Sequence, residues 1–81
     1  MFYFYLIKSK KTNKLYIGCS EDLKSRIESH NKGLNKSTKS GIPWELIYYE
    51  AYKNLSLARK REVTLKKYGQ GFRRLKERLG F

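Results

Sequence analysis

Cysteine is almost absent from this chain, since Cys19 is the only one in 81 residues. A single cysteine excludes a disulfide within the chain and a zinc site built from several of its own cysteines. Disulfides are rare in reducing compartments, so a chain with one thiol is typical of an intracellular protein. We therefore expect a cytoplasmic location.

Acidic residues are also scarce. Seven Asp and Glu stand against 19 Lys and Arg, which gives a formal net charge of +12. The sequence contains no Asp-x-Asp or other paired-carboxylate spacing, and this argues against a nuclease site that holds two metal ions. The glycine-rich phosphate loop of NTPases and the Gly-x-Ser-x-Gly elbow of hydrolases are missing too.

The positive charge points to a polyanionic partner, and nucleic acid is the one we expect. An anionic membrane surface would suit the same charge. Membrane-binding helices, however, combine basic residues with a broad face of Leu, Phe or Trp, and this sequence has no such helix. A ribosomal or RNA-packing role stays open.

Long apolar runs are lacking. The opening MFYFYLI spans seven residues, whereas a membrane helix needs roughly 20. It also lacks the basic start and small-residue cleavage site of a signal peptide. With 40% hydrophobic and 15% aromatic residues, the chain has the composition of one folded domain over residues 1–81.

The first 19 residues predict a β-hairpin. Phe2 to Ser9 is rich in aromatic and β-branched residues, Lys10 to Lys14 is a polar turn signal, and apolar residues return from Leu15 to Cys19. Side chains alternate between the two faces of a strand, so Tyr5 and Tyr16 could be cross-strand neighbours on one face. Gly18, on the same face as Tyr16, would leave open space in which a ligand could approach the backbone.

A helix is predicted after the hairpin. Ser20 is the expected N-cap, and the two acids that follow it would place negative charge in the first turn. Gly33 is the expected C′ residue. The apolar stripe of this helix contains Leu23, Ile27 and His30, with Arg26 at its edge.

The rest of the chain predicts a loop, a strand and two helices. The polar loop is expected from Asn31 to Pro43 and the strand from Trp44 to Tyr52. A second helix, capped by Asn54 or Ser56, should run to about Tyr68 and end at Gly69 and Gly71, and a short terminal helix would contain Phe72, Leu75 and Leu79. The order ββαβαα predicts an α/β (α+β) fold, with a small three-stranded, mainly antiparallel sheet flanked by helices.

Glu62 stands out in the second helix because it lies on the face that Leu55, Ala58 and Leu65 would bury. An unpaired buried charge costs several kcal/mol, so this carboxylate needs a partner, either a basic side chain such as Arg26 or a metal ion. A purely structural Glu62–Arg26 ion pair and a functional site explain this pattern equally well. Taken singly, Arg26 is better explained as a snorkelling side chain, and strand tyrosines as packing residues.

Together these residues resemble the GIY-YIG nuclease superfamily, and in particular its small single-domain bacterial members. The sequence FYL at Phe4 to Leu6 is followed by YIG at Tyr16 to Gly18, with Tyr3 in place of the first glycine. Further matching features are Arg26 ten residues after Tyr16, His30 one helical turn later, PWELIYYE at 43–50, and ARKREVTLKK at 58–67 with Glu62. The resemblance covers nearly the whole chain.

The resemblance implies a metal-dependent DNA endonuclease that hydrolyses phosphodiester bonds with Mg²⁺ or Mn²⁺, in DNA repair or recombination. By resemblance, Glu62 holds the metal, Arg26 stabilises charge on the phosphate, and His30 handles a proton or contacts phosphate. Tyr5 and Tyr16 flank the attacking water, one of them as general base, and we favour Tyr16. A base, an arginine and a metal can together supply what phosphodiester cleavage needs.

Phosphate contacts by basic residues would hold the substrate. We expect them from Lys32, Lys36, Lys39, Arg59 and Lys66. No helix suited to reading the major groove is evident, so sequence specificity should be low, and RNA is a second possible ligand. The alternative function is a non-catalytic nucleic-acid-binding module that retains the nuclease fold.

Overall fold

The computed structural model describes residues 1–67 and 69–81. In this part of the chain three strands form one antiparallel sheet, β1 (Phe2–Ser9), β2 (Leu15–Ser20) and β3 (Trp44–Tyr52). The strand order is β2-β1-β3, so β1 lies in the middle and pairs with both others. This confirms the predicted α+β architecture with its small antiparallel sheet.

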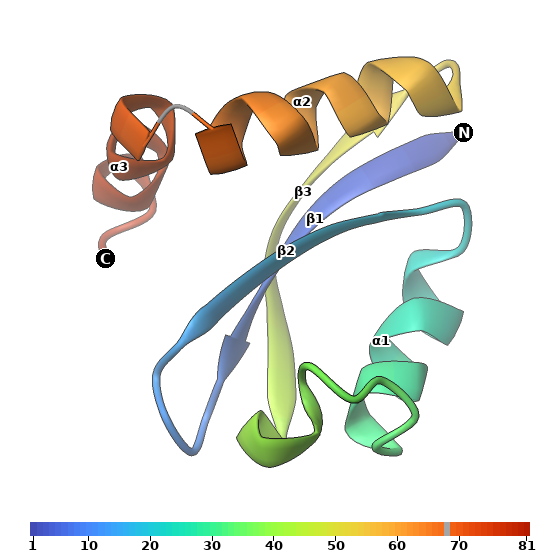
Figure 1. Cartoon of the computed structure of the whole chain (residues 1–81), viewed down its shortest axis with the longest axis vertical. Coiled ribbons are helices and arrows are strands. Elements are labelled where there is room, and N and C mark those ends of the chain that lie inside the picture. The colour runs from blue at the N-terminus through green and yellow to red at the C-terminus, as the bar shows by residue number, and fades with distance from the viewer. Residues whose placement is uncertain (68) are drawn as a thin grey trace.

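The helices cover both faces of this sheet. They are α1 (Leu23–Asn31), α2 (Leu55–Lys67) and α3 (Gly69–Arg78), with a short 3₁₀ helix η1 at Lys39–Gly41. In Figure 1 the sheet runs between α2 at the top and α1 at the lower right. Among the described helices, none is long and apolar enough to cross a membrane.

The central strand β1 carries the core on both of its faces. Phe4 and Leu6 pack with Leu65 of α2 and Leu75 of α3. On the other face, Tyr5 and Ile7 pack with Trp44, and Leu23 and Ile27 of α1 lie against this cluster. The four consecutive residues from Phe4 to Ile7 are therefore all buried, as expected of a strand covered on both sides.

The start of α1 differs from the prediction. The N-cap is Asp22, whose side chain accepts a hydrogen bond from the Ser25 amide at 3.1 Å. Ser20 belongs to β2, where it pairs with Tyr3, so the strand continues to a residue expected to begin the helix. The acids Glu21 and Asp22 consequently precede the first turn instead of lying in it. Gly33, with φ of 75°, follows the C-cap as predicted.

The helices after β3 were predicted in outline. Asn54 caps α2, because its side-chain oxygen accepts from the Leu57 amide at 3.0 Å. The expected helix end at about Tyr68 lies outside the described residues. Gly69 is the first residue of α3 and Gly71 lies inside this helix, so the prediction that Gly71 ends a helix is wrong. Burial of the α3 residue Leu75 against the sheet offsets the helix-breaking tendency of these glycines.

Candidate active site

Tyr5 and His30 meet in the interior between β1 and α1. The Tyr5 hydroxyl lies 2.8 Å from Nε2 of His30. Tyr5 is 1% exposed and His30 is not exposed at all. The histidine of the predicted site is therefore in contact with the first tyrosine and does not reach the surface.

Thr38 determines which nitrogen of the His30 ring carries the proton. Its Oγ1 lies 2.7 Å from Nδ1 of His30 and also donates to the Asn35 carbonyl at 3.4 Å. With its own proton used there, Oγ1 accepts from Nδ1–H, which leaves Nε2 to accept from the Tyr5 hydroxyl. Burial lowers the pKa of His30, and the charge of Arg26 lowers it further, so the ring is neutral. Sequence reasoning missed Thr38, since one threonine in a polar loop gives no periodic signal.

Trp44 holds the Thr38 loop in place. Its indole Nε1 donates to the Thr38 carbonyl at 2.7 Å. The side chain of Asn31 in turn bonds both the amide and the carbonyl of Trp44, at 2.6 and 3.0 Å. Gly41 is needed beside the indole, because a Cβ there would lie 2.5 Å from the Trp44 ring. The loop is thus fixed to β3 and to α1 at once.

Tyr5 and Tyr16 lie on one face of the hairpin as cross-strand neighbours, as predicted. Tyr5 is opposite Gly18, and Tyr16 is opposite Ile7, so the two tyrosines are diagonal neighbours and not a direct pair. The expected open space above Gly18 is filled by Tyr5, because a Cβ at Gly18 would lie 2.5 Å from the Tyr5 hydroxyl oxygen. The glycine therefore admits the phenol and not a ligand.

Tyr16 still belongs to the same cluster. Its ring centroid lies 5.2 Å from that of His30 and 6.3 Å from that of Trp44. The Tyr5 ring lies 5.9 Å from His30, so both tyrosines contact the one histidine. Tyr16 is half-buried, which leaves it more accessible to solvent than Tyr5.

Arg26 reaches this cluster from the exposed side of α1. A hydrogen bond to the Tyr5 hydroxyl raises the pKa of Arg26. Burial raises the pKa of Tyr5, and Arg26 opposes that effect. The guanidinium therefore stabilises the phenolate form of a tyrosine that burial would otherwise keep neutral.

Glu62 approaches from α2, on the other face of the sheet. Its side chain is 20% exposed, and its Oε2 lies 2.9 Å from Nζ of Lys66. Within the described residues this ion pair replaces the predicted partner Arg26. The two helices pack on opposite faces of the sheet, which explains why the carboxylate pairs within its own helix.

Cys19 links Glu62 to the hairpin. Burial and a hydrogen bond to Glu62 raise the pKa of the Cys19 thiol to about 12, so the thiol stays protonated and donates to the carboxylate. The charge of Glu62 is also among the causes that raise the pKa of Tyr5. Glu62 thus lies within electrostatic reach of the phenol, at the β2 edge of the sheet.

The carboxylate fits one kind of metal site and not another. Residues 1–67 and 69–81 contain no group of three or more His, Cys, Asp and Glu that could enclose an ion. Mg²⁺, however, keeps most of its waters and needs only one or two carboxylates together with substrate phosphate. Glu62 suits such an open site, provided that Lys66 releases it.

The five predicted phosphate-binding residues are all exposed. Arg59 and Lys66 lie on α2 and act electrostatically on Cys19, so they border the site. The other three, Lys32, Lys36 and Lys39, follow α1 at its C-cap and in the loop that carries Thr38.

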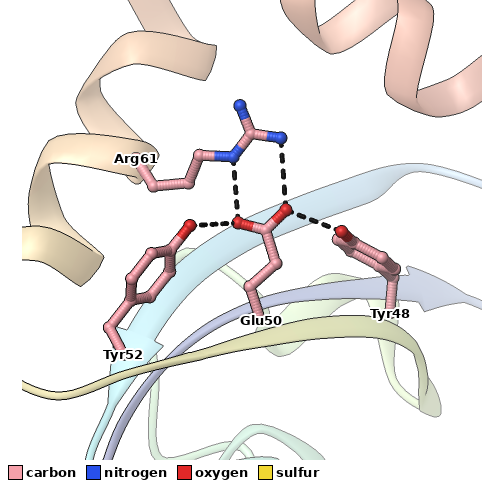
Figure 2. Close-up of polar contacts among 4 residues, drawn as sticks. All are labelled: Tyr48, Glu50, Tyr52 and Arg61. Atoms are coloured by element: carbon pink, nitrogen blue, oxygen red, sulfur yellow. Dashed lines mark hydrogen bonds and ion pairs between the residues drawn. The ribbon is translucent and has the colours of Figure 1, made fainter.

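A second polar cluster, which sequence reasoning missed, ties α2 to β3. Figure 2 shows Glu50 between Tyr48, Tyr52 and Arg61, and Arg61 bonds both carboxylate oxygens, at 2.9 and 3.1 Å. Burial alone would raise the pKa of Glu50, but hydrogen bonds from these three side chains hold it below its ordinary value. Arg61 precedes Glu62, so this contact also fixes the rotation of α2. The alternation of residues 48, 50 and 52 on one strand face was the available signal.

Comparison with known proteins identifies the family of this chain. The model of the GIY-YIG catalytic domain matches residues 1–76. Similar proteins include UPF0213 proteins of Staphylococcus aureus strains Mu3, Mu50 and N315, each 40% identical over 65 residues, which is 79% of this chain and 78% of the relative. No solved structure matches the chain significantly. The chain therefore belongs to the GIY-YIG family, a nuclease superfamily.

Proposed function

We propose that this protein is a metal-dependent endonuclease that hydrolyses phosphodiester bonds in DNA with low sequence specificity, in repair or recombination in the cytoplasm. We also propose that residues 1–81 act as one domain. The observation that carries the proposal is the pair of hydrogen bonds that joins Tyr5 through His30 to Thr38, with Arg26 acting on the same phenol. A protein that only bound nucleic acid would not need a buried phenol placed between a guanidinium and a neutral imidazole.

Tyr5 is the general base in this proposal. Its proton points at Nε2 of His30, which has a free lone pair to accept it. As the attacking water gives its proton to the Tyr5 oxygen, Tyr5 passes its own proton to Nε2 of His30, and the reverse transfer returns that proton to solvent water after cleavage. This replaces our sequence-based preference for Tyr16, which is assigned to orienting the water.

Arg26 has a second role at the phosphate. Its side chain is exposed, so it can turn from the phenol towards a phosphate oxygen and uncover the Tyr5 hydroxyl as it does so. Charge that develops on the phosphate is then stabilised by the guanidinium. His30 acts through Tyr5, because its burial keeps it from the substrate.

Glu62 would hold Mg²⁺ or Mn²⁺. Such an ion supplies neutralising charge to the phosphate and to the leaving oxygen. The chain contributes one carboxylate held by Cys19 and Lys66. Lys66 would have to release Glu62 for this carboxylate to hold the ion, and its ammonium would then be available to a DNA phosphate.

The substrate is bound through its phosphates. The exposed cations Arg59 and Lys66 would contact one part of the backbone, and Lys32, Lys36 and Lys39 another. Each phosphate contact steepens the salt dependence of binding by about 0.9 in the log–log slope. Contacts of this kind carry no base information, which supports low specificity.

A plasmid-nicking assay tests the proposal. Wild-type protein with Mg²⁺ or Mn²⁺ should nick supercoiled DNA, and Glu62→Ala should bind the same DNA without nicking it. The matched control is Glu77→Ala on α3, which should nick at the wild-type rate. Equal background nicking by all three proteins, with equal DNA binding, would instead establish the alternative, a nucleic-acid-binding module without catalysis.

A further inference from the structure

Tyr3 and Tyr49 form an exposed aromatic corner on the α1 face of the sheet. Their ring centroids are 5.8 Å apart and the ring planes meet at 72°. Tyr49 is 53% exposed, and it is the direct partner of Tyr5 in the register of β1 and β3. The corner therefore adjoins the strand position that carries the proposed base.

This corner is one wall of an open depression of about 700 Å³. The other wall is the start of α1, with Glu21, Asp22, Leu23 and Lys24. Two of the seven acids in a chain of charge +12 thus lie together beside two aromatic rings. Their charge disfavours a phosphate in the depression itself.

We propose that this depression binds one unpaired base of the nucleic-acid strand, and that it prefers bases with an exocyclic amino group. The inference rests on the proposed function only in taking a nucleic acid as the ligand. A planar base can stack on one tyrosine ring and meet the edge of the other, as bases do on aromatic side chains of strand-binding proteins. The wall at the start of α1, with Glu21 and Asp22, then faces the edge of the base.

The carboxylates give the preference. Glu and Asp accept hydrogen bonds from the amino group of cytosine, and the amino groups of adenine and guanine offer similar donors. Thymine and uracil present a carbonyl oxygen at the matching position, which a carboxylate repels. Asp22 uses one oxygen to cap α1, so its other oxygen and the side chain of Glu21 are the acceptors for the base.

Lys24 completes the nucleotide site. It lines the depression, and its ammonium can contact the phosphate attached to the bound base. Lys24 and Arg26 are two residues apart on α1, so they point to different sides of the helix. A strand that has one phosphate at Arg26 and a base in the depression would cross the beginning of α1.

Aromatic rings beside carboxylates also suit an organic cation. The ammonium of Lys24 at the rim and the charge of +12 on the chain work against that occupant. The depression therefore favours a base over an organic cation, and the experiment below distinguishes the two.

The test is binding without metal, so that no cleavage is required. Glu62→Ala protein in EDTA is titrated with fluorescein-labelled nine-residue strands (dC)₉ and (dT)₉ at fixed salt, and with (rC)₉ and (rU)₉ for the ribose forms. We expect (dC)₉ to bind at least about fivefold more tightly than (dT)₉. Backbone amide shifts at residues 21–24, measured by NMR with (dC)₉, should locate the contact.

Variants then assign the preference to this depression. Tyr49→Leu should weaken (dC)₉ binding several-fold, and Phe81→Leu, a matched change at another exposed ring, should not. The double variant Glu21→Gln with Asp22→Asn keeps a good N-cap and should bring (dC)₉ and (dT)₉ to equal affinity. Glu77→Gln should leave the difference unchanged.

Three results would overturn the inference. The first is equal affinity for (dC)₉ and (dT)₉ without amide shifts at residues 21–24. The second is a preference for (dC)₉ that persists in the double variant, and the third is amide shifts at residues 21–24 that tetramethylammonium causes and (dC)₉ does not. Nicking is measured separately. If the protein does not nick DNA but still prefers amino bases, the proposed nuclease function is wrong and the base site remains. If it nicks DNA without this preference, the base site is wrong and the nuclease function remains.

Discussion

The hydroxyl of Tyr5 donates to Nε2 of His30 across 2.8 Å, in a region that solvent does not reach. The imidazole can accept this hydrogen bond only while it is neutral, and burial, aided by Arg26, lowers its pKa. One contact therefore serves both the packing of α1 on the sheet and the proton transfer that the proposed reaction needs. Removing the Tyr5 hydroxyl should therefore affect both stability and cleavage, as the first prediction states.

Tyr5→Phe should reduce the single-turnover nicking rate by about 10² to 10⁴, the usual contribution of a general base. The ring remains, so the fold should persist, with a loss of about 1–3 kcal/mol from the unpaired Nε2. Thermal unfolding and nicking measured on the same preparation check both effects. A larger rate loss in Tyr16→Phe than in Tyr5→Phe would move the base to Tyr16.

Thr38→Val should leave Nδ1–H of His30 without its acceptor and lower the free energy of unfolding by about 1–3 kcal/mol. The imidazole ¹⁵N shifts should also move, because the tautomer is no longer fixed. Ser37→Ala, which removes an exposed neighbouring hydroxyl, is the control and should cost less than about 0.5 kcal/mol. Unchanged ¹⁵N shifts in Thr38→Val would contradict the assigned tautomer.

Gly18→Ala should destabilise the protein by about 1–3 kcal/mol, because the new methyl group would lie 2.5 Å from the Tyr5 oxygen. Gly69→Ala is the matched control, since nothing lies within 4 Å of a Cβ there. Urea unfolding of both variants gives the comparison. Equal midpoints for the two would show that Tyr5 does not need the space above Gly18.

Glu50→Gln should remove an acid-sensitive part of the stability. The pKa of Glu50 is lowered in the folded state, so the unfolded chain binds more protons as the pH falls below about 4.3. The carboxylate therefore stabilises the fold above that pH, and this contribution is lost as the pH falls through the lower, folded-state value. Unfolding free energies from pH 7 to pH 3 should fall less steeply in the variant, and parallel curves would refute the assignment.

Lys66→Met should lower the Mg²⁺ concentration that gives half-maximal nicking, because Glu62 no longer has to leave an ammonium 2.9 Å away. DNA binding should weaken at the same time, with a salt slope smaller by about 0.9. The partly exposed pair itself contributes about 0–1 kcal/mol, so folding should be little affected. Lys67→Met, one residue along, serves as the comparison, and an identical Mg²⁺ dependence in wild type and Lys66→Met would argue against the coupling.

The sequence predicted the fold well because its signals are local. Aromatic and β-branched residues indicated the strand Phe2–Ser9, and Gly33 marked the end of α1. The errors lie where two elements compete for the same residues. Ser20 has the side chain of an N-cap, but pairing with Tyr3 keeps it in the strand.

The site was harder to predict, because its contacts join distant segments. Helical periodicity placed Arg26 and Glu62 beside the core, yet it could not show that their helices pack on opposite faces of the sheet. The exact register was equally invisible, so the space above Gly18 was expected to be open, whereas Tyr5 fills it. Thr38 and Glu50 were missed because each owes its importance to a partner 8 or 11 residues away.

The fit of Tyr5 into the space beside Gly18 has a consequence for how this protein can diverge. A larger residue at position 18 becomes tolerable only when the ring at position 5 is reduced or withdrawn, and that second change removes the phenol. A descendant that abandons cleavage is thus released from both constraints together. Loss of the activity would therefore be marked by two linked substitutions, a side chain gained at position 18 and an aromatic ring lost at position 5.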